Sequence, residues 1–455
     1  MAFSASVLGS SNPDFLTFQT PSLGGTSLLM EGFEGDDTLA SSVDLDGASL
    51  TGGQGNDSIF IDEEFGEQFS VLNSSVKAGD GSDTIEIGWQ FGFVTDWLSN
   101  FTNGNSGDDS IVAYTETISD STFQGGQGSD TIYLETELAQ NGNLIGGNLG
   151  NDSIWLATGN NTDPGIVDTT VNGGQGEDTI LTYYEKVADS QFNGDLGNDS
   201  IYLYETDLTD TTVRGGDGAD TINVWYQYDA GNNGLFINGN AGNDSIYFYD
   251  VDTSSSTVQG GQGDDSILVE FGDFKGNLVN GNLGDDSILV YDSYVDGSTF
   301  RGGQGQDTID LYYAITDGET TVSGDIGADL LIGGEDASIS FFYRYGDTGV
   351  NASGAGRDTI DYFDYEDNIA TADGISSLAI LNTTSLNNFI SDAAGSLNSG
   401  AAFQWYDDRV DSSYVFISDG SGSLNSDDIL IQVYDADPAV GPYTFKLDGD
   451  KIVLA

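Results

Sequence analysis

The sequence predicts an all-β protein: a parallel β-solenoid followed by a small β-rich carboxy-terminal domain. Three observations lead to this expectation. A glycine turn that ends in aspartate recurs along most of the 455 residues. Alternating apolar and polar residues follow each turn, which is the period of a strand with one buried face. With 64 Gly and few Lys, Arg and Met, the chain is also a poor helix former, so we expect very little helix.

The repeat is defined by its aspartate, which occurs fifteen times at spacings of 20 to 29 residues, most often 21. Gly always stands two residues before it, Ser or Thr follows it in fourteen copies, and Ile or Leu comes next in all fifteen. Because the spacing tolerates insertions, the variable part of each unit is expected to be a surface loop. The fifteen are Asp37, Asp57, Asp83, Asp109, Asp130, Asp152, Asp178, Asp199, Asp220, Asp244, Asp265, Asp286, Asp307, Asp329 and Asp358.

Each unit contains a second short strand that leads into the next glycine turn, as in "STFQ" and "TTVR". A single unit of this kind cannot bury its apolar face. Stacked copies would bury it as continuous columns of Ile, Val, Leu and Phe, with coils about 4.8 Å apart. The repeats therefore predict a solenoid that needs no globular core.

The charge of the chain limits its partners. Asp and Glu number 75 against 10 Lys and Arg, which gives a formal net charge of -65. This sign excludes nucleic acid and anionic membrane surfaces as partners. The 24 Phe, 22 Tyr and 5 Trp count against a disordered acidic tail. The acidic residues thus belong to a folded region that needs counter-charge from salt, basic proteins or metal cations.

Several classes of site are excluded by composition. The chain has no His and no Cys, which excludes the usual zinc sites, Ser-His-Asp triads and disulfides. The amino terminus lacks the features of a conventional secretory signal, and no apolar run is long enough for a membrane helix. Carboxylates are so frequent that no pair stands out as catalytic, and we expect no enzyme. The basic candidates share no constellation in the sequence: Lys77, Lys186, Arg214, Lys275, Arg301, Arg344, Arg357 and Arg409.

The repeated aspartates are predicted to hold metal ions. One motif per coil would place them in a column about 4.8 Å apart. Two unit charges at that spacing repel by roughly 1 kcal/mol in water and by about 3 to 4 kcal/mol at an effective dielectric of 20. Ca²⁺ between coils would reverse this repulsion, because it prefers carboxylate and carbonyl oxygens. All fifteen aspartates are therefore candidate calcium ligands. The alternative is a metal-free solenoid in which Gly and Asp only form turns.

The motif resembles that of a known family. "GGQGSDTIY", from Gly125 to Tyr133, matches the GGxGxDxUx nonapeptide of the RTX (repeats-in-toxin) calcium-binding proteins, as does "GGQGDDSIL" at Gly260. The resemblance covers residues 32–361 and implies a calcium-loaded parallel β-roll that is secreted by a type I system. On this basis residues 1–31 are expected to be a cap or assembly arm. Residues 362–455 are expected to be a β-rich domain that contains the secretion signal.

The sequence departs from the family pattern in two ways. The motif returns about every 21 residues rather than every nine. In addition, the fourth residue before the aspartate alternates from residue 105 onward, as in Asn105, Gly126, Asn148 and Gly174. One unit per coil is the favoured interpretation, and two units per coil, with motifs on opposite edges, is the alternative.

The resulting functional expectation is a secreted, calcium-stabilised structural protein of the cell exterior that assembles into a filament or surface layer. The alternative is a monomeric RTX-type adhesin or carbohydrate-binding module, with a cell-surface polysaccharide as its partner. Aromatic residues recurring in register on one outer face would favour the second hypothesis. A mixed, acidic outer face would favour the first.

Overall fold

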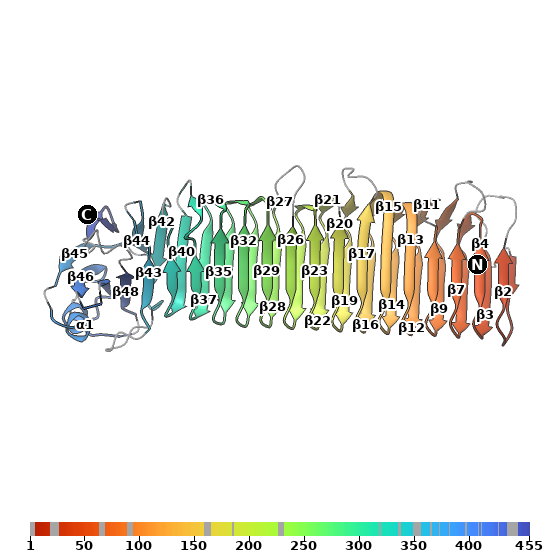
Figure 1. Ribbon diagram of the computed structural model, residues 1–455, viewed down its shortest axis with the longest axis horizontal. Coiled ribbons are helices and arrows are strands. Elements are labelled where there is room, and N and C mark those ends of the chain that lie inside the picture. Colours follow the sequence, from red (N-terminus) through yellow and green to blue (C-terminus); the bar gives the residue numbers. More distant parts are fainter. Residues whose placement is uncertain are drawn as a thin grey trace. The chain divides into compact units, whose positions relative to one another are not determined.

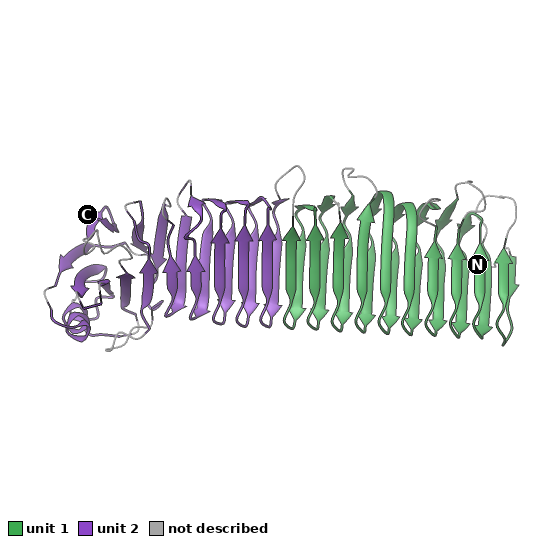
Figure 2. Ribbon diagram, viewed as in Figure 1, with its two compact units in different colours: residues 1–230 green, residues 231–455 purple. Residues whose placement is uncertain are grey.

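The computed structural model contains two compact units, residues 1–230 and residues 231–455 (Figure 2). The described chain consists of β-strands and the turns and loops that join them, and α1 (Leu386–Ala394) is the one helix in it (Figure 1). This confirms the predicted all-β fold class. The structure describes residues 5–18, 27–62, 69–88, 94–158, 165–183, 186–225, 232–316, 318, 320–334, 338–348, 356–364, 366–372, 374–381, 383–395, 398–407, 409–410, 412–425, 427–434 and 445–455.

Unit 1 is a parallel β-solenoid in which each coil contributes one strand to sheet A and at least one to sheet B. Neighbouring coils pair in register. Ile85 lies beside Ile59 on one side and Ile111 on the other, and each partner is one repeat away in the sequence. One repeat unit therefore makes one coil, and the alternative of two units per coil is excluded.

The strands of unit 1 fall into three columns. Sheet A contains β1 (Ala5–Leu8), β3 (Leu28–Glu34), β6 (Ser49–Gln54), β9 (Ser75–Asp80), β12 (Phe101–Ser106), β14 (Thr122–Gln127), β16 (Leu144–Leu149), β19 (Thr170–Gln175), β22 (Gln191–Leu196) and β25 (Thr212–Asp217). The main strands of sheet B are β2 (Phe15–Phe18), β4 (Thr38–Ser41), β7 (Ser58–Ile61), β10 (Thr84–Ile87), β13 (Ser110–Ser119), β15 (Thr131–Asn141), β17 (Ser153–Thr158), β20 (Thr179–Tyr183), β23 (Ser200–Tyr204) and β26 (Thr221–Trp225). A third, shorter column contains β5 (Leu45–Asp46), β8 (Ser70–Leu72), β11 (Val94–Leu98), β18 (Ile166–Val167), β21 (Lys186–Ala188) and β24 (Asp207–Thr209).

The interior of unit 1 consists of stacked apolar side chains. The residue two places after the motif aspartate is fully buried in coil after coil, as Ile59, Ile111 and Ile154 illustrate. Sheet A supplies a facing column that includes Phe123 and Val171. Burying an apolar side chain of this size stabilises the fold by about 1.5–3 kcal/mol. Each coil is thus held mainly by the coils above and below it.

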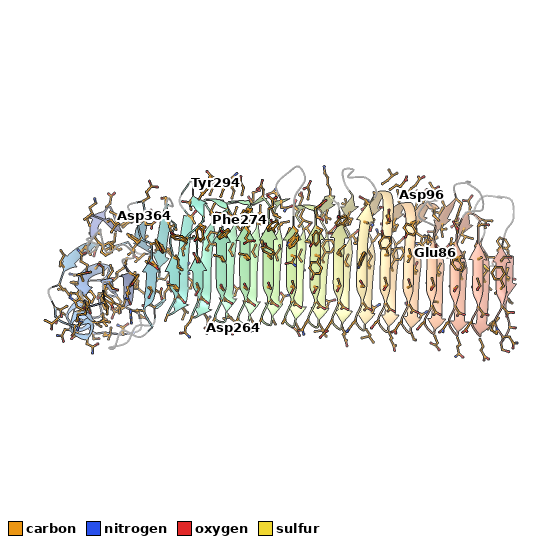
Figure 3. All side chains as sticks on the ribbon, viewed as in Figure 1. Glu86, Asp96, Asp264, Phe274, Tyr294 and Asp364 are labelled. Atoms are coloured by element: carbon orange, nitrogen blue, oxygen red, sulfur yellow. The ribbon has the colours of Figure 1, made fainter. Side chains whose placement is uncertain are left out.

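Unit 2 has the same coil pattern. Its sheet A strands are β28 (Phe236–Ala241), β31 (Thr257–Gln262), β34 (Leu278–Leu283), β37 (Thr299–Gly305), β40 (Thr320–Gly327), β42 (Ile339–Tyr343) and β44 (Asn368–Thr371). The main sheet B strands are β29 (Ser245–Tyr249), β32 (Ser266–Glu270), β35 (Ser287–Tyr291), β38 (Thr308–Asp310), β41 (Leu330–Ile332) and β43 (Asp358–Asp361). The third column contains β27 (Asn232–Asn233), β30 (Thr253–Ser254), β33 (Asp273–Lys275), β36 (Tyr294–Asp296) and β39 (Ile315–Thr316). Within this unit, Asp264 marks the edge with the glycine turns, and Tyr294 on β36 marks the opposite edge (Figure 3).

The small β-rich carboxy-terminal region covers the last coil of unit 2. Strand β43 pairs with β48 and β44 pairs with β50, so the last sheet B and sheet A strands each have a partner from this region. The region contains β45 (Ser377–Ile380), α1, β46 (Ala401–Asp407), β47 (Ser412–Ser418), β48 (Ile429–Tyr434), β49 (Phe445–Asp448) and β50 (Lys451–Leu454).

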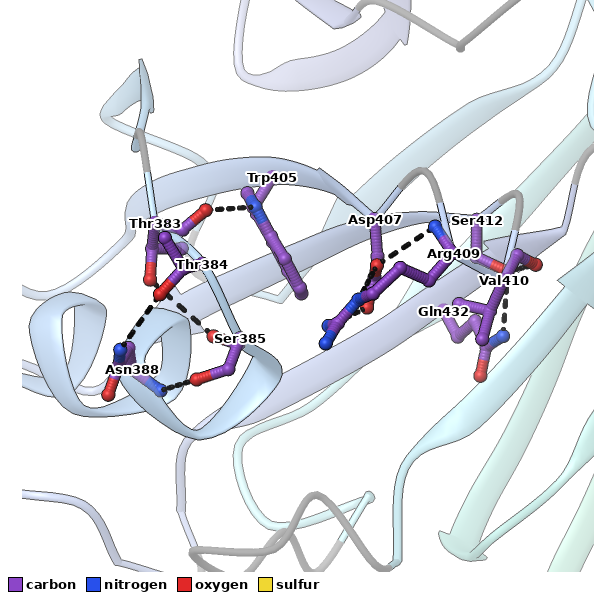
Figure 4. A network of polar contacts seen from close by, with 10 residues as sticks. All are labelled: Thr383, Thr384, Ser385, Asn388, Trp405, Asp407, Arg409, Val410, Ser412 and Gln432. Atoms are coloured by element: carbon purple, nitrogen blue, oxygen red, sulfur yellow. Dashed lines mark hydrogen bonds and ion pairs between the residues drawn. The ribbon is translucent and has the colours of Figure 1, made fainter.

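Helix α1 is fixed by a cap and by aromatic packing. The Ser385 hydroxyl accepts the backbone N–H of Asn388 at 3.3 Å, which satisfies one free donor of the first turn (Figure 4). The Trp405 indole N–H donates to the carbonyl of Thr383 at 3.1 Å, just before the helix begins. Phe389 on the helix packs against Trp405, with ring centroids 5.8 Å apart. These contacts hold the helix on the antiparallel strands β46 and β47.

Candidate metal centre

The repeated aspartates lie at the turn between each sheet A strand and the following sheet B strand, where they form a hydrogen-bonded ladder. Within each unit, the Oδ1 atom of one aspartate accepts the backbone N–H of the aspartate one coil earlier. In unit 1 these bonds run from Asp37 to Asp220 at 2.7–2.8 Å. In unit 2 they run from Asp244 to Asp358 at 2.8–3.0 Å. The structure therefore places all fifteen predicted residues at equivalent positions.

The second carboxylate oxygen, Oδ2, makes no such bond. It is buried and has no hydrogen-bond partner in thirteen of the aspartates. A buried, unpaired carboxylate oxygen is strongly unfavourable unless a proton or a cation compensates it. The thirteen are Asp37, Asp57, Asp83, Asp109, Asp130, Asp152, Asp178, Asp199, Asp265, Asp286, Asp307, Asp329 and Asp358.

The glycine five residues before the aspartate makes room for Oδ2. A Cβ on Gly104 would lie 2.2 Å from Oδ2 of Asp109 and 2.4 Å from the carbonyl oxygen of Gly125 on the next coil. Neither oxygen can be approached that closely by carbon. A carboxylate oxygen and a carbonyl oxygen from neighbouring coils thus lie close together beside this glycine. Both are hard donors of the kind that Ca²⁺ prefers.

The opposite edge of the coil provides an internal comparison. There the same kind of ladder is built from neutral side chains: the N–H of Ser74 donates to Oδ1 of Asn100 at 2.8 Å, and the N–H of Ser121 donates to Oδ1 of Asn143 at 3.0 Å. The side-chain N–H of Asn100 donates a hydrogen bond to the carbonyl oxygen of Val71 at 2.7 Å. Neutral residues therefore satisfy this backbone pattern. The negative charge on the aspartate edge is not needed for the ladder itself.

Burial raises the pKa of the ladder carboxyls, and repulsion between neighbouring aspartates raises it further in most copies, while the hydrogen bond from the backbone lowers it. The pKa reaches about 6 for Asp57, Asp83, Asp130, Asp178, Asp199 and Asp329. It reaches about 7 for Asp109, Asp152, Asp265, Asp286 and Asp307. In the metal-free fold these groups therefore hold protons up to nearly neutral pH, and above it they need another cation.

The donor set fits a hard cation in part. Carboxylate and carbonyl oxygens are present, and neighbouring coils present one ladder carboxylate each. Within the described residues, no group of three or more Asp, Glu, His or Cys side chains is arranged to hold a metal ion. An ion on the column would thus take at most two carboxylates from this geometry, with carbonyl oxygens and water completing its shell. The assignment of the fifteen aspartates as metal ligands stays a prediction.

The structure corrects one sequence inference. The basic residues are expected from the sequence to share no constellation, but Arg301 and Arg344 both approach Asp325. Arg301 lies 2.7 Å from Oδ2 of Asp325, and Arg344 lies 3.9 Å from its Oδ1. The repeat contains the signal for the first contact, because Arg301 pairs with Ser323 one coil later, two residues before Asp325. The contribution of Arg344 comes from a longer turn that the repeat does not predict.

The alternation four residues before the aspartate also has a structural reason. This position has positive φ in each coil from Asn105 to Asp325, for example 78° at Asn105 and 124° at Gly126. Asn and Asp tolerate the left-handed region, and Gly also adopts the larger positive φ values seen at positions such as Gly126. A Cβ on Gly126 would lie 2.2 Å from the carbonyl oxygen of Asn105, so the coil stacked on an Asn coil needs Gly.

Comparison with known proteins gives no family assignment: no protein-family model matches the sequence, and no curated relative is found. The RTX resemblance therefore rests on the motif. In the described part of the chain, no helix is long and apolar enough to cross a membrane.

Proposed function

We propose that the protein is a secreted structural protein of the RTX kind, stabilised by Ca²⁺ outside the cell, whose subunits assemble end to end into a filament or surface layer. The aspartate column supports the calcium part: thirteen buried Oδ2 atoms lack a hydrogen-bond partner, and the neutral ladder shows that the coil itself does not require charge. The motif resemblance supports type I secretion. A repeat solenoid of this kind is typical of structural proteins, and we propose no catalytic role.

The assembly proposal rests on the exposed edge of the first coil of unit 1. Among the described residues, β1 pairs only with β3 and β2 pairs only with β4. Leu16 lies beside the fully buried Leu39, yet it is itself only half-buried, and within the described residues no strand pairs with the other side of β2. Phe15 is 73% exposed and Leu8 is 54% exposed. A coil edge that has no strand partner among the described residues exposes backbone donors and acceptors together with apolar side chains, and so templates the addition of another strand.

The carboxy-terminal region of a second subunit offers edge strands for this contact. In the described chain β45 pairs only with β46, and β49 pairs only with β50. Ile380 on β45 is 64% exposed. A contact between two different surfaces does not close on itself unless its rotation forms a ring, so repetition produces a filament.

The substitution Leu16→Glu is expected to abolish end-to-end assembly and to leave the β-sheet circular dichroism signal intact. It places a charge on the uncovered side of the end coil, where a neighbouring subunit would bury it. Light scattering of the calcium-loaded protein would show large particles for the wild type and only small ones for the variant. Leu138→Glu, at a 48% exposed position in β15, is the matched control and should assemble normally. A calcium-loaded wild type that stays small at high concentration contradicts the proposal.

One observation favours carbohydrate binding as a second function. Aromatic rings lie close together on the outer face of sheet B, where Tyr133 and Trp155 pair in register and Tyr114 lies diagonally from Tyr133. In unit 1, Tyr114, Tyr133 and Trp155 follow one another at 5.8 and 6.3 Å between ring centroids. Trp155 is 44% exposed. Cross-strand aromatic pairs also stabilise sheets by themselves, so exposure is the feature that suggests a ligand. The carboxylate of Glu135, which accepts the Tyr133 hydroxyl at 2.7 Å, makes a neutral polysaccharide a better candidate than an anionic one.

Trp155→Ala is expected to weaken binding to a neutral polysaccharide about tenfold, because it removes a large stacking surface. The measurement is retardation in affinity electrophoresis through gels that contain individual soluble polysaccharides. Leu149→Ala, an exposed apolar residue on sheet A, is the control and should be retarded like the wild type. If no polysaccharide retards the wild type, the aromatic column is a strand-stabilising feature alone.

A further inference from the structure

The outer face of sheet A repeats every two coils rather than every coil. Coils with Asn or Asp four residues before the motif aspartate are named ridge coils, and coils with Gly there are named gap coils. In four of the six ridge coils an exposed apolar residue follows: Leu149 and Leu196 in unit 1 and Leu283 and Ile326 in unit 2, which are 42–53% exposed. Ser106 and Ala241 take this place in the other two. In the gap coils between them, Gln175 and Gln304 take this place.

Depressions lie over the gap coils. In unit 1, a cavity of about 670 Å³ lies over Gly174 and Gln175, between the Asn148–Leu149 and Asp195–Leu196 ridges. In unit 2, a cavity of about 480 Å³ occupies the same place over Gly303, between the ridges at Asn282 and Asp325. With coils about 4.8 Å apart, the two ridges that flank each depression are about 9.6 Å apart.

Part of this face, from β12 to β22, is nearly uncharged. From β12 to β22 the outward-facing residues of sheet A are amides, hydroxyls, glycines and apolar side chains, and Asp195 is the one acid among them. The amides also bond to one another: Asn103 donates to Gln124 at 3.1 Å, and Asn193 donates to Asn172 at 2.8 Å. A rigid, neutral face on a protein with a net charge of -65 can approach a like-charged body.

We propose that this face packs against the same face of a second copy of the chain, with the ridges of each copy in the depressions of the other. The second copy is the preferred occupant because its ridges have the same spacing as these depressions. Its corresponding face also lacks the charge that would make two such acidic molecules repel. Contacts of this kind, in which both partners use the same surface, are the commonest in homo-oligomers.

The two-coil period selects one arrangement. A twofold axis parallel to the solenoid would place each coil opposite its own copy, so ridges would meet ridges. A twofold axis that runs across the face, between two adjacent coils, makes the solenoids antiparallel. It keeps each residue column opposite itself but places every ridge coil opposite a gap coil. Leu196 of one copy then faces a glutamine such as Gln127 or Gln175 of the other.

The test is cysteine cross-linking in a chain that has no native Cys. Single variants Leu149→Cys and Leu196→Cys mark ridges, and Gln127→Cys and Gln175→Cys mark gaps. All four cysteine variants also carry Leu16→Glu, so that end-to-end assembly does not contribute to the cross-linking. In calcium buffer under mild oxidation, at least one mixture of a ridge variant with a gap variant should form disulfide-linked dimers at least tenfold faster than any ridge variant alone. Tyr183→Cys, on the outer face of sheet B, is the control and should form no disulfide-linked dimers.

A second measurement covers the chance that the introduced thiols disturb packing. By sedimentation equilibrium in the same background, Leu149→Lys combined with Leu196→Lys should weaken dimerisation at least tenfold. Ridge-to-ridge coupling that matches ridge-to-gap coupling would overturn the proposed packing, and so would a protein that sediments as a monomer at high concentration. Because the packing uses sheet A and not the exposed edge of the first coil, it can hold even if end-to-end assembly fails, and the reverse is also true.

Discussion

Removal of calcium at pH 7.5 is expected to unfold the solenoid, and lowering the pH to about 4 in the same buffer is expected to restore it. In the metal-free fold, the ladder carboxyls have pKa values of about 6 to 7, against 3.8 in the unfolded chain. The folded state therefore binds more protons than the unfolded state between about pH 4 and pH 7. Its stability falls as the pH rises through that range. Below it, the carboxyls are neutral in both states and the full contribution is present.

Circular dichroism of EDTA-treated protein across this pH range measures the effect. Ca²⁺ should restore the β signal at pH 7.5, and Mg²⁺ should do so much less well because it demands a more rigid shell. Sodium chloride at about 1 M controls for simple screening, which acts on exposed charges more than on buried ones. A β signal that is unchanged in EDTA at pH 8 would mean that the aspartates are only turn formers.

Gly128→Ala is expected to destabilise the calcium-loaded protein by roughly 4 kcal/mol, which is large for a single methyl group. Gly128 has φ of 125°, and a Cβ there would lie 2.1 Å from the carbonyl oxygen of Gly107 on the preceding coil. To relieve this clash, the two coils must move apart, which breaks the aspartate ladder beside them. The measurement is the free energy of unfolding in urea at saturating calcium.

The matched control is Gly276→Ala, at a loop glycine that also has positive φ, 62°, but where an added Cβ would have no heavy atom within 4 Å. It is expected to cost about 1 kcal/mol, the penalty of a left-handed Ala alone. Equal losses for the two variants would show that backbone conformation, and not close contact between coils, explains the glycine of the motif.

The sequence was sufficient to predict the coil but not all of its edges. Aspartate, glycine and Ile recur at fixed offsets, and a solenoid pairs each of these with its own copy one repeat away, so Ile85 lies beside Ile111 as the spacing predicts. The neutral ladder through Asn100 and Asn143 was not predicted. Its members vary among Ser, Thr and Asn and lie next to loops of variable length, so no fixed motif marks them.

The sequence also predicts the aspartate site only in part. The spacing of the aspartates predicted a column, but which oxygen meets the backbone N–H depends on how the turn places the side chain. That geometry leaves Oδ2 of Asp130 buried beside Gly125, and the sequence contains no signal for it beyond the glycine itself. The meeting of Arg344 with Asp325 depends on the path of a long turn. Such contacts follow from the three-dimensional path of one coil and not from the repeat.

The measurement that tests the central claim most directly is calcium binding by equilibrium dialysis at pH 7.5. Wild-type protein is compared with the double variant Asp130→Asn and Asp152→Asn, in which Oδ1 can still accept the ladder hydrogen bond but the charge is gone. We predict that the wild type binds several calcium ions per chain and that the variant stays folded and binds fewer. A folded wild type that binds no stoichiometric calcium, or a variant that binds as many ions as the wild type, would contradict the assignment of the aspartate column as a metal centre.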